Sequence, residues 1–275
     1  MSIPTIQSLH IYPIKSCGSI SLSEVKLDEY GFENDRRWLL LDDTGTFLTQ
    51  RECPSLARVL PSIDQEFLKL EYSGVGNIGI PLQSEETTIT TTSVFNSPPL
   101  DVSDEGDAAS EFFGAVIGKK CRLVRRADTY RRDVSSGHLV NEGHQVNFSD
   151  SHPLLLLSTA SLSDLNSQLV TPILGDRFRA NIILTNVQSA FEEDTWREIV
   201  INENTLLFGK KCSRCTVTTI NQQTSESSKE PLTTLSTFRR DGKGNVMFGS
   251  YFAHKVKSGV LHTGDSIHVV NHEDN

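Results

Sequence analysis

The sequence predicts a strand-rich α+β protein built on β-barrels or β-sandwiches, and three observations lead to this prediction. Short apolar or alternating runs, separated by turn residues, fill most of the first hundred positions. Only three stretches show the spacing or the start signals of a helix. Strands and helices do not alternate as they do in βαβ folds, and no segment repeats at a fixed period.

Composition narrows the class of protein before any motif is considered. The chain has 275 residues, enough for one large or two modest domains, and its formal net charge is -9. Nucleic-acid-binding proteins usually have a basic face, so this acidic balance argues against that class. No apolar run is long enough to span a bilayer, and the N-terminus lacks the pattern of a secretory signal. We therefore predict a cytoplasmic protein that binds neither nucleic acid nor membranes and keeps its five cysteines reduced.

The first half of the chain is predicted to consist of strands, one helix and a further strand. Strand-like runs cover residues 5–14, 21–31, 36–51, 66–74 and 121–127. The turn residues of 42–46 indicate a hairpin within the third of these runs. Residues 103–120 are predicted to form an amphipathic helix that ends at Gly118. Its apolar side chains recur at helical spacing, at Ala109, Phe112, Phe113 and Val116.

Residues 127–148 are polar and show little periodicity, so they are interpreted as a long connection between two domains, 1–126 and 127–275. A buried strand is predicted at 152–158, and a helix is predicted after it, with Ser158 or Thr159 as the N-cap. Pro231 fits the first turn of a further helix. The remaining strands are predicted within residues 176–186, 194–209 and 246–270.

Cys212 and Cys215 stand three positions apart in "GKKCSRCTVTTIN". A closed structural zinc site needs four ligands, and the sequence has no second close cysteine pair. A thioredoxin-like switch needs the pair at the start of a helix, whereas the β-branched run "TVTTI" favours a strand. Two inert core thiols are a third interpretation, but the neighbouring Lys210, Lys211 and Arg214 would stabilise a thiolate.

The remaining interpretation is a single soft thiolate that binds a metal. A metal that arrives on an anionic cofactor would also need basic and hydroxyl side chains from other segments. Several segments offer them, although each group taken singly is typical of a solvated surface: Lys15 and Ser16, Arg36 and Arg37, Ser149 to His152, and Arg179 with Asn181. The last two alternate in a predicted strand and should therefore share a face.

Eight motifs, taken in order, give the sequence a family resemblance. They are "IYPIKSCG", "NDRRWLLLDDTGTFLTQRECPSLARV", "DSHPLLLLSTASLSDLNSQL", "FRANIIL", "DTWREI", "CSRCTVTTIN", "KEPLTTLSTFRR" and "FGSYFAHKVKSGVLHTGDSIHVV". Together they resemble the MOSC-domain proteins, and among these the mitochondrial amidoxime-reducing component and its bacterial relatives. The resemblance covers nearly the whole chain and implies an N-terminal MOSC-associated β-barrel domain followed by a MOSC β-barrel domain, with a few short helices.

The resemblance implies a molybdenum cofactor, in which a pterin dithiolene with a terminal phosphate holds the metal. Cys215 matches the cysteine that ligates molybdenum, and Cys212 matches a non-ligating cysteine. Ser151 and His152 fall where the family has a Thr-Ser pair near the cofactor, and His152 departs from that pattern. The other positions that match cofactor contacts are Lys15, Ser16, Arg36, Arg179, Asn181, Ser213, Arg214 and Tyr251.

The implied reaction is the two-electron reduction of N-hydroxylated compounds such as amidoximes and hydroxylamines. The sequence has neither a ferredoxin-type cysteine pattern nor a G-x-G-x-x-G fingerprint. The electron donor is therefore expected to be a separate ferredoxin, flavodoxin or cytochrome b5-like protein with its own reductase. Two alternatives stay open. One is a sulfur carrier with a persulfide on Cys215, with pyridoxal phosphate on Lys15 as a variant, and the other is a non-enzymatic carrier of the cofactor.

Overall fold

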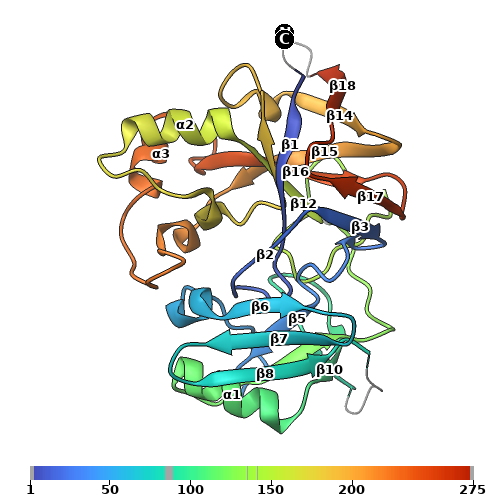
Figure 1. Ribbon diagram of the computed structural model, residues 1–275, viewed down its shortest axis with the longest axis vertical. Helices are drawn as coiled ribbons and strands as arrows, with labels where there is room; N and C mark the ends of the chain where they lie inside the picture. Colours follow the sequence, from blue (N-terminus) through green and yellow to red (C-terminus); the bar gives the residue numbers. More distant parts are fainter. Residues whose placement is uncertain (1–2, 84–88, 135, 141, 273–275) are drawn as a thin grey trace.

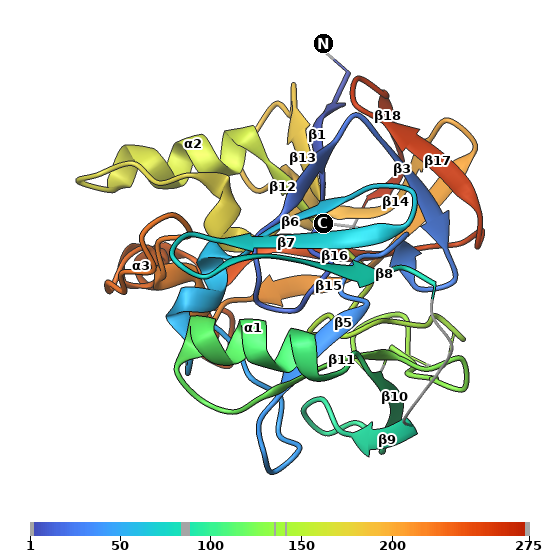
Figure 2. The same ribbon diagram turned by 60° about the horizontal axis from the view of Figure 1, so that its bottom comes forward.

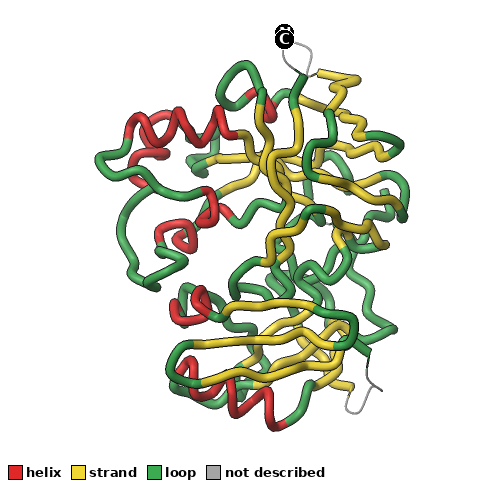
Figure 3. The backbone as a smooth tube through the Cα atoms, in the orientation of Figure 1, coloured by secondary structure: helices red, strands yellow, loops and turns green. Residues whose placement is uncertain are grey.

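Strands dominate the protein, as the sequence predicts. The computed structural model describes residues 3–83, 89–134, 136–140 and 142–272. Within these ranges the chain forms eighteen strands and three α-helices. Figure 1 shows the largest sheet, with helices α2 and α3, at one end of the molecule, and helix α1 with strands β6, β7 and β8 at the other. Most of the helical segments lie along one side of the molecule (Figure 3).

The largest sheet has eight strands in the order β18-β14-β15-β16-β12-β13-β1-β2. It curls until β1 meets the residues just before β18, where the Ile6 amide donates to the Asp265 carbonyl at 2.9 Å. The strands of this sheet are β1 (Thr5–Ile11), β2 (Ile20–Leu22), β12 (Leu154–Ser158), β13 (Ile182–Thr185), β14 (Trp196–Ile201), β15 (Asn204–Ser213), β16 (Met247–His254) and β18 (Ile267–His272).

The described residues form three smaller sheets as well. One joins β5 (Trp38–Leu41), β11 (Arg122–Arg126), β10 (Leu100–Asp104) and β9 (Ile89–Thr92). Another joins β6 (Leu60–Ile63), β7 (Phe67–Tyr72) and β8 (Gly76–Pro81). The third joins β17 (Gly259–His262), β3 (Glu24–Asp28) and β4 (Gly31–Phe32). Because β1 pairs with β13 and β3 pairs with β17, the first strands of the chain belong to sheets of its C-terminal half. The division at residue 126 stays a prediction.

The three α-helices are α1 (Asp107–Ile117), α2 (Thr159–Gln168) and α3 (Leu232–Phe238). The Ser158 hydroxyl accepts a hydrogen bond from the Ser161 backbone N–H and caps α2, which confirms the predicted N-cap. Pro231 caps α3 and does not enter its first turn. α2 and α3 lie on the same side of the large sheet (Figure 2). Within the described residues, every helix is too short to span a membrane.

The two largest apolar cores among the described residues lie at opposite ends of the molecule. The first lies within the large sheet and includes Leu9, Leu156, Ile182 and Trp196. The second lies between α1, β5 and β7 and includes Trp38, Leu68 and Phe113. The predicted connection 127–148 is well packed, since it buries Tyr130, Val134, Val146 and Phe148. Tyr130 and Phe148 pack with Leu39 of the first half, and Val134 and Val146 pack with Ala253 of the second, so the connection contacts both halves.

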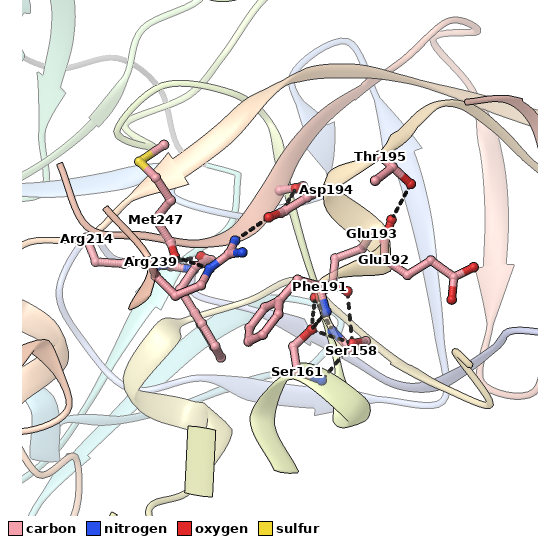
Figure 4. A network of polar contacts seen from close by, with 12 residues as sticks. Ser158, Ser161, Phe191, Glu192, Glu193, Asp194, Thr195, Arg214, Arg239 and Met247 are labelled. Carbon is pink, nitrogen blue, oxygen red and sulfur yellow. Dashed lines mark hydrogen bonds and ion pairs between the residues drawn. The ribbon is translucent and has the colours of Figure 1, made fainter. Parts of the chain in front are cut away.

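A buried polar network joins α2 to the large sheet (Figure 4). Glu193 and Asp194 lie in the short 3₁₀ helix η3 (Glu192–Asp194) and are both buried. Glu193 accepts hydrogen bonds from the hydroxyls of Ser158 at 2.9 Å and Ser161 at 2.7 Å. Asp194 forms an ion pair with Arg239, at the end of α3. These contacts satisfy charges that would otherwise be costly to bury.

Two further local predictions, both near the pocket described below, are wrong. Arg179 and Asn181 do not lie in a strand, because β13 begins only at Ile182 and Arg179 ends the 3₁₀ helix η2 (Gly175–Phe178) in a left-handed conformation. The run "TVTTI" is also not a strand, because Thr216–Thr219 form the 3₁₀ helix η4. Thr218 and Thr219 donate their hydroxyls to the carbonyls of Cys215 and Thr216, and this local bonding competes with strand pairing.

Candidate functional site

A pocket of about 330 Å³ lies where the two halves of the chain meet. It is lined by the loop after β1, the turn before β5, the segment before β12, the η2–β13 connection, and the ends of β15 and β16. The structure brings all eleven predicted site residues to this pocket: Lys15, Ser16, Arg36, Ser151, His152, Arg179, Asn181, Ser213, Arg214, Cys215 and Tyr251. Which of them bind a ligand stays a prediction.

The pocket is strongly basic, although the chain as a whole is acidic. Its lining includes seven basic side chains, namely Lys15, Arg36, Arg51, Arg177, Arg179, Lys210 and Arg214, and one acidic side chain, Asp150. Cations gathered in a concave, partly buried site attract anions more strongly than the same charges in open solvent. Sequence reasoning did not assign Arg51, Arg177 or Lys210 to the site, because a single charged residue on a strand or loop has no distinguishing pattern.

Four of the lining residues have a left-handed backbone. The φ angles are 72° at Ser16, 46° at Arg36, 54° at Phe95 and 54° at Arg179. Side chains other than glycine disfavour this region, at a cost of about 1–3 kcal/mol each. Backbone hydrogen bonds fix two of these turns, since the Arg36 amide donates to the Tyr12 carbonyl and the Arg179 amide donates to the Asp176 carbonyl. Strained turns of this kind cluster at functional sites, which supports a role for the pocket.

Arg36 and Arg179 are held together around Tyr12. Both guanidinium carbons lie 4.3 Å from the centroid of the Tyr12 ring. Arg36 pairs with Asp35 at 2.6 Å and donates to the Arg179 carbonyl at 2.9 Å, and Arg179 donates to the Cys17 carbonyl at 2.6 Å. Burial and the neighbouring Arg36 lower the pKa of Arg179 to about 10, so it remains a cation at neutral pH. Both guanidinium groups are therefore held in fixed positions at the pocket wall, and Asp35 balances the charge of Arg36.

Lys15 is a second fixed charge, and it is nearly fully buried. Its ammonium donates to the Phe148 carbonyl at 2.9 Å and forms an ion pair with Asp150. Burial lowers the pKa of Lys15, and Asp150 opposes that shift. The segment that carries Asp150 is held from its other side by Arg132, which donates to the carbonyls of Asn147 and Ser149. Lys15 is therefore committed to partners within the protein.

The five cysteines are free, and they differ in exposure. Cys215 is exposed and faces the pocket, whereas Cys212 is 1% exposed. Burial raises the pKa of Cys212, although Arg214 and a hydrogen bond with Tyr251 oppose this. The Cys215 carbonyl accepts hydrogen bonds from both the backbone N–H and the hydroxyl of Thr218, which fixes the backbone next to the exposed thiol. Cys215 is thus the thiol that a ligand in the pocket can reach.

Arg214 and Asn181 are both tied into the pocket wall. Arg214 donates to the carbonyls of Phe248 at 2.7 Å and Phe178 at 3.0 Å. Its Nη2 atom is buried and has no hydrogen-bond partner among the residues that the structure describes. The side-chain amide of Asn181 donates a hydrogen bond to the His10 carbonyl and accepts one from the Leu155 backbone N–H, so it joins β1 to β12. Arg214 therefore keeps an unused donor, whereas the polar atoms of Asn181 are already engaged.

Fold and pocket together describe a β-rich protein with a basic cavity and one accessible thiol. Residues 3–120 match the MOSC N-terminal beta barrel domain, and residues 143–268 match the MOSC domain. Mitochondrial amidoxime-reducing component 1 of Mus musculus is 30% identical over 98% of this chain and 83% of its own length. The chain therefore belongs to the MOSC-domain family.

Relatives of similar identity do not all share one name. The molybdenum cofactor sulfurase of Danio rerio is 30% identical over 97% of this chain, which spans 34% of that protein. Mitochondrial amidoxime-reducing component 1 of Homo sapiens is 29% identical over 98% of this chain and 83% of its own length. A solved structure, the YUAD protein of Bacillus subtilis, aligns over 97% of this chain and 94% of its own at 11% identity, with a TM-score of 0.40 that supports no argument.

Proposed function

We propose that the pocket binds the molybdenum cofactor, with Cys215 as the protein ligand of the metal, and that the protein reduces N-hydroxylated compounds. The observation that carries the proposal is the exposed Cys215 thiol, which faces a cavity lined by seven basic side chains. Relatives that match 83% of their own length are named amidoxime-reducing components, which supports amidoximes as the substrate class.

The pocket suits this cofactor in charge, size and ligand supply. The pterin phosphate and dithiolene are anionic, and arginine forks bind such groups through charge-assisted hydrogen bonds. The buried Nη2 of Arg214 is a donor without a partner among the described residues. A cavity of about 330 Å³ is within the range of small-molecule sites. The described residues contain no group of three or more metal-binding side chains, and a cofactor that brings its own sulfur ligands needs only one from the protein.

The proposed reaction takes up two electrons and two protons: R–NHOH + 2 e⁻ + 2 H⁺ → R–NH₂ + H₂O. The cofactor, when bound, supplies the two-electron redox chemistry at the metal. Cys215 would hold the metal, and Lys15, Arg36, Arg179 and Arg214 would offset the negative charge of the cofactor. The hydroxyls of Ser16, Ser151, Ser213 and Tyr251 would orient it. The fixed backbone turns at Arg36 and Arg179 prepare the site before the ligand arrives.

One measurement tests the proposal directly. Protein purified from a host that makes the cofactor is analysed for molybdenum and pterin per chain and assayed with benzamidoxime and dithionite-reduced viologen. We expect stoichiometric molybdenum and formation of benzamidine. Molybdenum without turnover would indicate a carrier of the cofactor. Protein-bound sulfane sulfur without molybdenum would contradict the proposal and support sulfur transfer.

Sulfur transfer is the second candidate, and the exposed thiol is the observation that favours it. An accessible Cys215 could carry a persulfide, and the relative from Danio rerio is named as a molybdenum cofactor sulfurase. The pyridoxal phosphate variant is less well supported. It requires a free amine at Lys15, whose ammonium is paired with Asp150 and bonded to the Phe148 carbonyl.

Arg179→Ala is expected to weaken retention of the cofactor. Removing one partner of a buried, charge-assisted contact costs about 2–5 kcal/mol, so much of the molybdenum and pterin should be lost during purification. The measurement is molybdenum and pterin per chain by elemental analysis and fluorescence. Arg240→Ala removes an exposed arginine outside the pocket and is the matched control. Equal cofactor content in both variants would exclude Arg179 from the binding site.

NADH alone is expected to support no turnover. The 275 residues contain neither a dinucleotide-binding fingerprint nor a ferredoxin-type cysteine pattern, which supports a separate protein as the electron donor. Molybdenum-loaded protein should reduce benzamidoxime with dithionite-reduced viologen or with a reduced ferredoxin, flavodoxin or cytochrome b5-like donor. Robust turnover with NADH and no added protein would refute the claim.

A further inference from the structure

Lys210 is a pocket cation that differs in its contacts from the cations described above. It lies on β15 opposite Tyr251 of β16 and is half-buried. Its ammonium donates to the Ser136 hydroxyl at 2.8 Å, a neutral acceptor. Lys15 and Arg36, in contrast, are paired with carboxylates. Among the residues that the structure describes, Lys210 has no ion-pair or carbonyl partner, so two of its three N–H groups are available to a ligand.

A chain of hydrogen bonds holds Lys210 in place. Ser136 is 3.0 Å from the Ser151 hydroxyl, which is 2.8 Å from Nδ1 of His152. The His152 ring is 1% exposed and stacks on Tyr251, with ring centroids 5.3 Å apart. Burial lowers the pKa of His152 to about 3, with Lys210 adding to the shift, so the imidazole is neutral at neutral pH. The flexible lysine side chain is therefore oriented before a ligand binds, which reduces the entropy cost of binding.

His152 has this position because residue 209 is a glycine. A Cβ atom at Gly209 would lie 2.1 Å from Nε2 of His152 and 2.2 Å from its Cδ2. Nε2 is buried without a hydrogen-bond partner among the described residues, so the polar contact of the ring with these residues is the one between Nδ1 and the Ser151 hydroxyl. The contact between Gly209 and His152 thus fixes the position of the imidazole, which is the last group in the series of hydrogen bonds that begins at Lys210.

The charged and titratable groups around Lys210 leave its positive charge unbalanced. Asp150 interacts with it but forms an ion pair with Lys15. The Cys212 thiol and the Tyr251 hydroxyl both have raised pKa values, mainly through burial, so both are neutral. His152 is neutral as well. A half-buried ammonium without a counter-charge is costly, and an anionic ligand would remove that cost.

We propose that Lys210 binds a carboxylate of the substrate, so that the preferred substrates are N-hydroxylated compounds that also carry a carboxylate. The inference rests on the proposed function. Lys210 is not among the positions that the family resemblance assigns to the cofactor, and it lines the same cavity as Cys215. The Ser136–Ser151–His152 chain acts as a positioning device for the ammonium.

The kinetic test compares para-carboxybenzamidoxime with its neutral carboxamide analogue. The measured quantity is the kcat/KM for the anionic substrate divided by the kcat/KM for the neutral one. This ratio should fall about tenfold in Lys210→Met, because one partly buried ion pair contributes about a factor of ten. It should stay near the wild-type value in Lys210→Arg, which keeps the positive charge. Lys211→Met removes the same charge from the neighbouring position, which does not line the pocket, and should leave the ratio unchanged. An equal loss for both substrates in Lys210→Met would overturn the proposal.

A second measurement does not depend on turnover. Calorimetry on the molybdenum-loaded protein compares binding of para-carbamoylbenzoate with that of the neutral terephthalamide, and Lys210→Met should weaken only the former, by about tenfold. Molybdenum and pterin per chain should match the wild type. A lower cofactor content in Lys210→Met would assign Lys210 to the cofactor and overturn the proposal. Absence of any turnover in the wild type would contradict the proposed function, and the calorimetric comparison would still decide the role of Lys210.

Discussion

Cys215→Ser is expected to abolish reduction of N-hydroxylated substrates, with a loss of more than about 100-fold in kcat, because even residues behind the metal ligands cost 10–100-fold. A hydroxyl is a hard, weakly acidic ligand and a poor substitute for a thiolate at a soft metal site. Cys215 is exposed, so the substitution should leave the stability of the fold nearly unchanged. The measurements are benzamidoxime reduction with reduced viologen, molybdenum content and the midpoint of urea unfolding.

Cys212→Ser is the matched control. Cys212 is buried and hydrogen-bonded to Tyr251, so this change should cost some stability but much less activity than the change at Cys215. A loss of activity in Cys212→Ser with activity retained in Cys215→Ser would reverse the assignment. Equal losses in the two variants would indicate that the pair works as a dithiol.

The sequence predicts the elements whose pattern is local. The apolar run of β12 and the hydroxyl of Ser158 indicate a buried strand and a capped helix, and both are present. Local patterns mislead where side chains bond to nearby backbone, as in the threonines of η4, or where the backbone turns left-handed, as at Arg179. Arg179 and Asn181 nevertheless reach one pocket, by a turn and not by strand alternation.

The rest of the pocket depends on contacts between distant segments. Arg51, Arg177 and Lys210 join the site only because the turn at residues 49–51, η2 and β15 line one cavity. The pairing of β1 with β13 brings Lys15 and Ser16 to the segment that carries Arg179. A charged residue within one segment of the sequence does not indicate which distant segment that segment will contact. The family resemblance assigned cofactor contacts within its eight motifs, and it left out Lys210, which lies two positions before "CSRCTVTTIN".

Gly209→Ala is expected to destabilise the fold by about 1–3 kcal/mol or more, since overpacking of a filled site costs that much. The new methyl group would lie 2.1 Å from the His152 ring. That ring cannot move easily, because it is 1% exposed and stacked on Tyr251. The free energy of unfolding is measured by urea denaturation. Gly114→Ala is the control, because its Cβ meets only the Lys119 carbonyl at 3.6 Å and it lies within α1. Alanine there should stabilise the protein by about 0.5–1 kcal/mol.

A second substitution shows whether the steric conflict is with His152. His152→Ala alone should destabilise the protein, because it leaves a cavity beside Tyr251. In the Gly209→Ala background the same change removes the clash, so the double variant should be more stable than the sum of the two single effects predicts, with a coupling of about 1–3 kcal/mol. Additive effects would mean that the methyl group conflicts with other atoms. Gly209→Ala at wild-type stability would show that the His152 ring does not fill the space over Gly209, and the orientation of Lys210 would then need another cause.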